Sequence, residues 1–349
     1  MVEQARDLVV VGASAGGVEA LRTFAAGLPA DLPAAVLVVL HLPVGGTSAL
    51  AAILDRSGPL PAVPARVGHP LTPGLIQVAP PGHHLLVLDR SVALSHGPTE
   101  NGHRPSVNAL FRSAAVAAGP AVTGILLSGA LDDGVAGLVA IAARGGLTMV
   151  QNPKEALYPS MPEHALRHLA VDFVLPAMEM GGKLATLVRE NVDPAAAPSP
   201  SRLLALENEI TMNPAANQRV EYAPGQLGDI SGFTCPDCSG SLVEVEPRRF
   251  RCRVGHAWTG NALLEAQDSA WERALWAAVR TLDEKVSLAR RMAEYARERG
   301  NGRLAERYLA DAGESGAAAE VLRRHLTTEP SARSADTRSA TPVTDAADG

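Results

Sequence analysis

The chain has 349 residues, of which 46% are hydrophobic and 19% are charged, and its formal net charge is −6. This length suggests about two domains, and the hydrophobic share is enough for a sizeable core. The negative balance argues against a protein whose main role is non-specific nucleic-acid binding. All three Trp and all three Cys lie between positions 235 and 276, which indicates that two differently built parts are joined.

The first part, up to about residue 190, alternates short apolar runs with helical patterns. Strands are predicted at 8–11, 35–40, 75–79, 122–127, 147–150 and 173–175, and a hairpin at 85–88 and 92–94. Helices are predicted at 17–26, 47–56, 107–118, 134–143 and 178–189. This alternation predicts an α/β domain over residues 1–190, with a doubly wound, mostly parallel sheet and helices on both faces.

The composition changes after residue 190. The segment 191–230 begins rich in Pro and Ala and is predicted to be a linker. Residues 231–260 hold the Cys and are predicted to form a small zinc-ribbon-like unit. Residues 261–327 are predicted to form a helical hairpin, and the tail 328–349, rich in Ser, Thr, Ala, Pro and Asp, is predicted to be disordered.

The predicted hairpin reverses at Gly300-Asn301-Gly302, which is a natural turn sequence. Its first helix carries an apolar stripe of nearly heptad spacing that begins at Trp271 and ends at Ala293. We expect this stripe to pack inside the hairpin against a second apolar face. That face consists of Leu304, Tyr308, Val321 and Leu322.

No targeting or membrane segment is expected. The stretch from Met1 to Asp7 lacks the basic region and apolar run of a signal peptide. A run of about 18 apolar residues, as a transmembrane helix needs, does not occur. Three Cys cannot build a disulfide framework, and this usage favours a reducing compartment. The sequence therefore predicts a cytoplasmic protein that does not insert into a membrane.

A glycine-rich turn follows the first predicted strand. Gly12-Ala13-Ser14-Ala15-Gly16 fits the Gly-x-Ser-x-Gly pattern, in which a sharp strand-to-helix turn presents a serine hydroxyl. The N–H groups at the start of the next helix can stabilise an oxyanion. A phosphate-binding turn is the alternative, but the spacing is not Gly-x-Gly-x-x-Gly and no acidic residue ends the second strand.

His41 and the pair Asp132 and Asp133 lie just beyond the ends of two other predicted strands. Each alone is typical of a structural role, such as a helix N-cap or a turn. In a doubly wound sheet, however, ligands and chemistry gather beyond the carboxyl ends of the strands. Together with Ser14 these residues supply the nucleophile, base and orienting carboxylate of acyl transfer. The residues themselves do not choose between the two aspartates.

Six short motifs occur in order along this first part, and together they are specific. They are Val11-Gly12-Ala13-Ser14-Ala15-Gly16-Gly17, Leu40-His41-Leu42-Pro43, Ala79-Pro80-Pro81-Gly82, His103-Arg104-Pro105-Ser106-Val107, Gly129-Ala130-Leu131-Asp132-Asp133-Gly134 and Met161-Pro162. The set resembles the catalytic domain of the chemotaxis protein-glutamate methylesterases, the CheB family. The resemblance runs from Leu8 to about Val188, a little over half of the chain.

The resemblance implies a Ser-His-Asp triad that falls on Ser14, His41 and Asp133, because the family's carboxylate directly precedes the glycine. It implies hydrolysis of glutamate γ-methyl esters on methyl-accepting chemotaxis-type receptors, with an acyl-enzyme and release of methanol. Some members also deamidate receptor glutamines, and catalysis needs no cofactor. The backbone N–H groups of Ala15 and of Ala130 are our interpretation of the oxyanion hole.

His103, Arg104 and Ser106 match a family motif that we expect near the site, where they would position the substrate. Arg104 either positions an acidic receptor segment or serves as a structural ion-pair partner, and both readings stay open. Many family members also carry an N-terminal phosphorylatable receiver domain. Because the first predicted strand begins by Leu8, no such domain is expected, and control is expected from a separate response-regulator partner or from the C-terminal part.

A different class of function is the alternative. The protein would then be a signalling adaptor that binds receptors or signalling partners through its C-terminal part, with weak or no esterase activity. The complete set of Ser14, His41 and Asp133 argues against an inactive enzyme.

Two ligand pairs stand out in the Cys-rich part. Cys235 and Cys238 are followed, after 13 residues, by Cys252 and His256, which is typical of a tetrahedral Zn²⁺ site. A unit of about 30 residues has little core, so a structural zinc is predicted to supply folding energy; the alternative is Cys packing as small hydrophobic residues. Four nearby arginines are interpreted as a solvated face rather than a site for an acidic partner or nucleic acid. They are Arg248, Arg249, Arg251 and Arg253.

Overall fold

The computed structural model describes residues 4–42, 46, 48–212 and 228–327. The chain divides into two compact units, Met1–Leu264 and Glu265–Gly349. The predicted catalytic region 1–190 and the Cys-rich region 231–260 thus lie within one unit. The predicted tail 328–349 and part of the predicted linker, 213–227, lie outside the described residues. No described helix combines the length and the apolar character needed to cross a bilayer.

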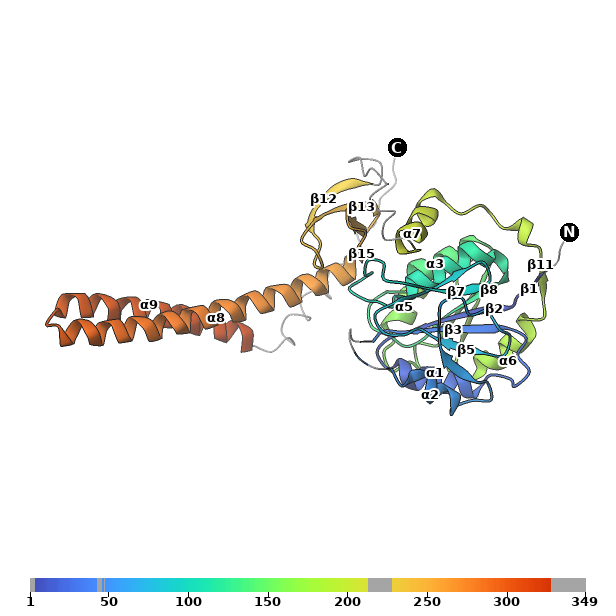
Figure 1. The fold of residues 1–349 in the computed structure, drawn as a ribbon, viewed down its shortest axis with the longest axis horizontal. Helices are drawn as coiled ribbons and strands as arrows, with labels where there is room; N and C mark the ends of the chain where they lie inside the picture. Colours follow the sequence, from blue (N-terminus) through green and yellow to red (C-terminus); the bar gives the residue numbers. More distant parts are fainter. Residues whose placement is uncertain (1–3, 43–45, 47, 213–227, 328–349) are drawn as a thin grey trace, which may run out of the picture. The chain divides into compact units, whose positions relative to one another are not determined.

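A seven-stranded sheet with strand order β10-β9-β8-β2-β3-β5-β4 forms the centre of the first unit (Figure 1). Every pair of neighbouring strands in it is parallel. Its strands are β2 Leu8–Ala13, β3 Ala35–Leu40, β4 Ala62–Pro64, β5 Ile76–Val78, β8 Val122–Leu126, β9 Leu147–Gln151 and β10 Phe173–Leu175. The prediction of a doubly wound parallel sheet is confirmed, since the apolar runs are the buried strands.

Helices cover both faces of this sheet and close two apolar cores. Alternate residues of a strand point to opposite faces, so Val9 and Val36 lie in one core while Val10 and Leu37 lie in the other. The first core is covered by α1 Gly17–Ala26, α2 Leu50–Asp55 and α6 Ala177–Leu187, and the second by α3 Val107–Ala118, α4 Val135–Ala143 and α5 Ser160–His168.

Smaller elements complete this region. Antiparallel pairs are formed by β6 His84–Leu88 with β7 Ser91–Ser95, as predicted, and by β1 Gln4–Ala5 with β11 Asn191–Val192. Two short 3₁₀ turns are η1 Gly119–Ala121 and η2 Pro194–Ala196. The sequence did not predict β4, which has three residues and ends in proline, or α5, whose buried side chains are few.

The predicted linker contains a helix, α7 Arg202–Met212. Leu204 and Ile210 are buried on it, and so is the carboxylate side chain of Glu207, which is 2% exposed. The prediction of a linker over 191–230 is therefore wrong for this segment. A buried glutamate breaks the apolar pattern from which an amphipathic helix is read.

The Cys-rich region is a four-stranded antiparallel sheet in the order β12-β13-β14-β15. Its core side chains include Leu242, Phe250 and Trp258. Arg249 and Arg251 form ion pairs with Glu207, at 2.7 and 2.9 Å. Interpreting these two arginines as part of a solvated face was therefore wrong. The strands are β12 Asp229–Thr234, β13 Ser241–Glu246, β14 Arg249–Cys252 and β15 Ala257–Thr259.

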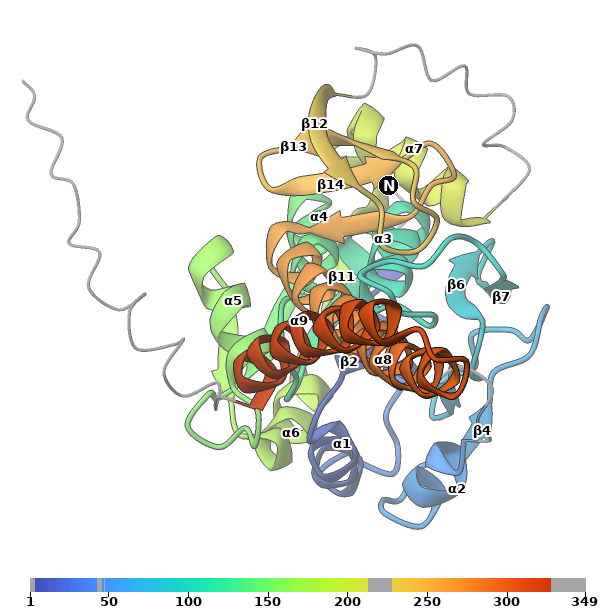
Figure 2. The same ribbon diagram turned by 90° about the vertical axis from the view of Figure 1, so that its left-hand side faces the viewer.

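Two long helices, α8 Gly260–Glu298 and α9 Gly302–Thr327, lie side by side as a hairpin (Figures 1 and 2). The chain reverses at the predicted glycines, where Gly300 has a positive φ of 72°. Ala293 of the predicted stripe is fully buried, and Trp271 makes an edge-to-face contact with His325 of α9. Val321, expected in the second apolar face, is instead 55% exposed.

Candidate active site

Ser14 lies in the turn that joins β2 to α1. Its N–H donates to the carbonyl of Ser128 at 2.9 Å, and its carbonyl accepts from Gly17 N–H at 2.8 Å. Gly16 has φ 68°, and a Cβ there would lie 2.8 Å from the Ser128 hydroxyl, so the turn requires glycine. The strand-to-helix turn predicted from the sequence is present and sets the serine beyond the carboxyl end of a central strand.

His41 follows β3, the neighbour of β2 in the sheet, and its N–H donates to Ala13 O at 3.2 Å. Its ring Nδ1 lies 2.9 Å from Ser14 Oγ, and its Nε2 lies 2.7 Å from Asp133 Oδ2. Because a carboxylate only accepts, Nε2 carries the proton and Nδ1 is left to accept the serine proton. The two ring nitrogens are used in the opposite sense from the serine-protease template.

The side chain of Asp133, which lies beyond the C-terminal end of α3 in the sequence, caps the N-terminus of that helix. Its Oδ2 accepts from Val107 N–H at 2.7 Å, and its Oδ1 accepts from the Ser106 hydroxyl at 3.0 Å and from Asn108 N–H at 3.3 Å. Burial acts to raise the pKa of Asp133, but the hydrogen bond and charge of His41, the charge of His103 and the Val107 N–H lower it to about 2. The carboxylate is therefore ionised at neutral pH, and its charge lies against the protonated Nε2 of His41.

The cap is reciprocal. Asn108 Oδ1 accepts from the N–H groups of Gly134 and Gly137, at 3.0 and 2.8 Å, and so caps the start of α4. Each of the two helices thus receives its cap from the segment that begins the other.

The two aspartates separate cleanly in the structure. Asp133 faces His41, whereas Asp132 turns away and accepts hydrogen bonds from Thr259 and Asn261. The alternative that the residues alone left open is thereby settled in favour of Asp133 as the neighbour of the histidine.

The three other residues of the family motif lie at different depths. The ring of His103 stacks on that of His41, with centroids 3.8 Å apart and planes 15° apart. Burial and the charge of His41 lower the pKa of His103 to about 4, so it is neutral at neutral pH. Ser106 is fully buried behind Asp133, and Arg104 donates to the carbonyls of His96 and Gly97. Ser106 therefore contacts the triad, whereas Arg104 holds its own loop.

The two predicted oxyanion donors lie on the loops beside Ser14. Within the described chain, the N–H groups of Ala15 and Ala130 have no hydrogen-bond partner. Gly129 packs so tightly that an added Cβ would lie 2.0 Å from Met161 Sδ and 2.9 Å from Ser14 Cβ. The loop that carries Ala130 therefore runs directly against Ser14.

Ser128 is a residue of this site that the sequence did not single out. Its hydroxyl donates to Ala15 O at 2.9 Å and accepts from Tyr158 N–H at 3.0 Å. These two hydrogen bonds join the turn of Ser14 to the segment that precedes α5. A serine next to a glycine at the end of a strand gives no sequence signal for that contact.

The structure brings the four predicted metal ligands together. Cys235, Cys238, Cys252 and His256 offer ligand atoms that all lie within 4.8 Å of one another. Sγ of Cys238 and Cys252 are 3.6 Å apart, and His256 Nδ1 lies 3.7 and 3.4 Å from Sγ of Cys235 and Cys252. A tetrahedron with zinc-to-ligand distances of about 2.0–2.3 Å has edges of roughly 3.5–3.8 Å. The donor set and its spacing therefore fit Zn²⁺.

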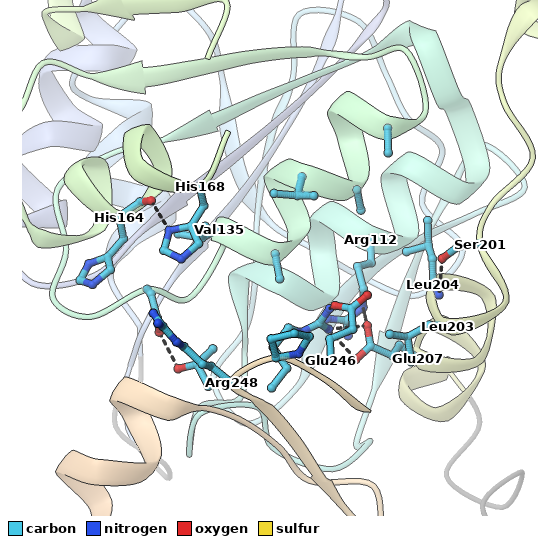
Figure 3. Close-up of a pocket in the computed structure, with 18 of the residues that line it drawn as sticks. Arg112, Val135, His164, His168, Ser201, Leu203, Leu204, Glu207, Glu246 and Arg248 are labelled. Carbon is cyan, nitrogen blue, oxygen red and sulfur yellow. Dashed lines mark hydrogen bonds and ion pairs between the residues drawn. The ribbon is translucent and has the colours of Figure 1, made fainter. Parts of the chain in front are cut away.

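A cavity of about 950 Å³ lies next to the loop of Asp132, and no triad residue lines it (Figure 3). Its wall includes Val135 of α4, His164 and His168 of α5, and Arg248 of the β13–β14 turn. It therefore does not serve as the cleft over Ser14.

The sequence profile described as CheB methylesterase matches residues 9–184, half of the chain. Two curated relatives named protein-glutamate methylesterase/protein-glutamine glutaminase come from Methanosarcina mazei, 36% identical over 192 residues, and Anaeromyxobacter dehalogenans, 43% identical over 173 residues. These alignments cover 53% and 49% of this chain and 52% and 49% of the relatives, so the chain spans about half the length of the curated relatives it matches.

A solved structure agrees with this match. The CheB methylesterase catalytic domain of Thermotoga maritima superposes with a TM-score of 0.50 at 30% identity, over 52% of this chain and 98% of that domain. The profile match, residues 9–184, includes Ser14, His41 and Asp133. The chain belongs to the CheB methylesterase family.

Proposed function

We propose that the chain is a protein-glutamate methylesterase that hydrolyses glutamate γ-methyl esters on methyl-accepting chemotaxis receptors. The observation that carries this proposal is the unbroken hydrogen-bonded line Ser14–His41–Asp133, with spacings of 2.9 and 2.7 Å. Nucleophile, base and ionised carboxylate meet at the carboxyl edge of the sheet, where this fold places its chemistry. The names of the relatives supply the substrate class.

The reaction follows from the geometry. Ser14 Oγ attacks the ester carbonyl carbon while its proton passes to His41 Nδ1, and Asp133 stabilises the resulting imidazolium. The N–H groups of Ala15 and Ala130 would donate to the oxyanion. Collapse of the intermediate breaks the bond to the methoxy group, which leaves as methanol with the proton from His41. Water then attacks the acyl-serine, again through His41, and releases the glutamate carboxylate.

The same steps with an amide release ammonia, so we extend the proposal to deamidation of receptor glutamines. No step needs a metal or organic cofactor. We place the reaction in the cytoplasm, a setting supported by the three unpaired cysteines. A separate response regulator is proposed as a controlling partner on the family resemblance alone.

We also propose that Cys235, Cys238, Cys252 and His256 bind a structural Zn²⁺. All four tetrahedral positions are filled by protein ligands, so the ion would have no open position for substrate. Elemental analysis should find about one zinc per chain in the purified protein and none in Cys235→Ser. Absence of zinc from the wild-type protein would favour cysteines that simply pack as small hydrophobic residues.

The deciding experiment measures methanol release from methylated receptor. Ser14→Ala should lower the rate at least 10⁴-fold, whereas the matched Ser57→Ala, at the end of α2, should leave it unchanged. Unchanged release by Ser14→Ala would refute the nucleophile assignment. The adaptor alternative is tested separately with a fluorophosphonate probe, because an inactive scaffold would not be labelled at Ser14.

A further inference from the structure

The loop between β8 and α4, which carries Asp133, contains a residue in an unfavourable backbone conformation. Leu131, two residues before Asp133, has φ 61°, in the left-handed region that bulky side chains rarely adopt. Such a conformation persists when contacts from elsewhere hold it. The contacts that hold this loop therefore affect where the catalytic carboxylate lies.

Asp132 receives two of those contacts, one from the last strand of the Cys-rich region and one from the start of α8 that follows it. Its Oδ1 accepts from Thr259 Oγ1 at 2.7 Å, and its Oδ2 accepts from Asn261 Nδ2 at 3.1 Å. Asp132 is only 8% exposed, so its side chain depends on such donors in place of water. Thr259 ends β15 and Asn261 lies in the first turn of α8, more than 120 residues along the chain.

The short strand β15 also makes hydrogen bonds with the segment that leads to His103, on the other side of the His41–Asp133 pair. Thr259 N–H donates to Asn101 Oδ1 and Asn101 N–H donates to Ala257 O, both at 2.8 Å, while Ala257 N–H donates to Thr99 O at 3.2 Å. Two residues beyond Asn101, the ring of His103 stacks on His41. β15 therefore touches the segments on both sides of the His41–Asp133 hydrogen bond.

The Cys and His cluster fixes β15 in place. His256 directly precedes the strand, and its carbonyl accepts from Cys252 N–H at 3.0 Å. Asp237, between Cys235 and Cys238, accepts from the Thr99 hydroxyl at 2.6 Å. The fold around the four ligands thus determines where Thr259 lies.

We propose that Thr259 and Asn261 are positioning residues for the triad, and that the Cys-rich region serves catalysis by carrying them to the loop of Asp133. This inference rests on the proposed esterase function. Neither residue reaches the ester; both act through Asp132. Their loss lets the loop relax, which lengthens the His41–Asp133 contact and slows the chemical step, while substrate binding is little affected.

The test compares Thr259→Val, which removes the hydroxyl and keeps the shape, with Thr259→Ser, which restores it. We expect Thr259→Val to lower kcat about tenfold with KM changed less than twofold, and Thr259→Ser to recover most of the rate. Thr281→Val is the matched control, because the hydrogen bond that the Thr281 hydroxyl makes among the described residues stays within α8, to Ala277 O. A kcat for Thr259→Val within twofold of wild type overturns the proposal.

Asn261→Ala is the second variant, because Thr259 Oγ1 also accepts from Ala262 N–H and its loss could weaken the start of α8. It should lower kcat in the same way without a change in melting temperature beyond a few degrees. A loss of kcat that follows the melting temperature in both variants, with no rescue by Thr259→Ser, would also refute a positioning role.

The rate at which a fluorophosphonate labels Ser14 separates this inference from the proposed function. If wild-type protein is labelled but releases no methanol from methylated receptor, the substrate assignment fails and the inference is still decided by labelling. Slower labelling of Thr259→Val and Asn261→Ala, again about tenfold, supports it. Equal labelling of wild type and both variants overturns it.

Discussion

The two sheets of the first unit are stabilised in different ways. The seven-stranded sheet buries consecutive apolar residues on both faces, as in Leu8–Ala13, and has an apolar core on each side. The four-stranded sheet buries few large apolar side chains, holds the cluster of three Cys and one His that could bind a metal, and pairs Arg249 and Arg251 with Glu207. The topology of the larger sheet brings Ser14, His41 and Asp133 together, whereas for the smaller sheet we expect metal coordination and charge to supply the stability.

Removal of zinc should have the largest effect and should affect the two sheets differently. With Cys252→Ser, or after chelation, we expect β12 to β15 to lose hydrogen-exchange protection while β2, β3 and β8 keep theirs. The reason is that binding of a structural zinc contributes on the order of 10 kcal/mol to such a small fold. Equal loss of protection in both sheets would show that they unfold as one, and protection retained in both would show that the metal is not needed.

Asp133→Asn tests the catalytic side alone. We expect kcat to fall about 10³–10⁴-fold, because the amide cannot stabilise the imidazolium or hold its tautomer. The neighbouring Asp132→Asn is the matched control and should cost only about tenfold, since Asp132 contacts Thr259 and Asn261 and not His41. Steady-state methanol release measures both, and equal losses would contradict the assignment of Asp133.

Glu207→Gln tests the charges that join the smaller sheet to α7. Burial acts to raise the pKa of Glu207, but Arg112, Arg251 and Arg249 hold it well below its usual range. Removing the charge takes from the buried Arg251 the carboxylate with which it pairs and should lower the free energy of unfolding by about 3–5 kcal/mol.

The control for that variant is Glu246→Gln, which removes a carboxylate that also pairs with Arg249 but is about half exposed. Its cost should stay below about 1 kcal/mol. Urea titrations measure both variants, and similar losses would show that burial of the Glu207 network does not matter.

Acid should destabilise the region around His41 and Asp133. We expect the loss in the free energy of unfolding to be smaller than that caused by Glu207→Gln. Because the folded pKa of His103 is about 4, an unfolded chain takes up a proton between pH 6.5 and 4 that the folded chain does not, and stability falls over that range by about 3 kcal/mol. Asp133, with a folded pKa of about 2, adds a further loss as pH falls from about 4 to 2.

His103→Gln should reduce the slope between pH 6.5 and 4, to which the buried His84, whose pKa is also lowered by burial, contributes as well. The exposed His168→Gln is the control and should leave the slope unchanged. Urea midpoints measured at intervals across that range would show the difference. A slope of unchanged size in His103→Gln would assign it to other groups.

The sequence predicted what local patterns encode. Apolar runs predicted the strands of the parallel sheet, and ordered motifs predicted Ser14, His41 and Asp133, which the structure brings together. Periodicity missed α7 because Glu207 is buried there by charges some 40 residues away. The hydrogen bond from Thr259 to Asn101 joins residues 158 positions apart, and no local signal encodes it.

The exchange of caps between Asp133 and Asn108 has a practical consequence for transplantation and redesign. A segment around residues 133–137 moved to another scaffold would lose the amide that closes its helix, and 106–108 moved alone would lose its carboxylate. Because Asp133 contacts His41 and also caps a helix, its replacement by glutamate would displace two helix starts at once. The two segments must be inherited, or engineered, as a pair.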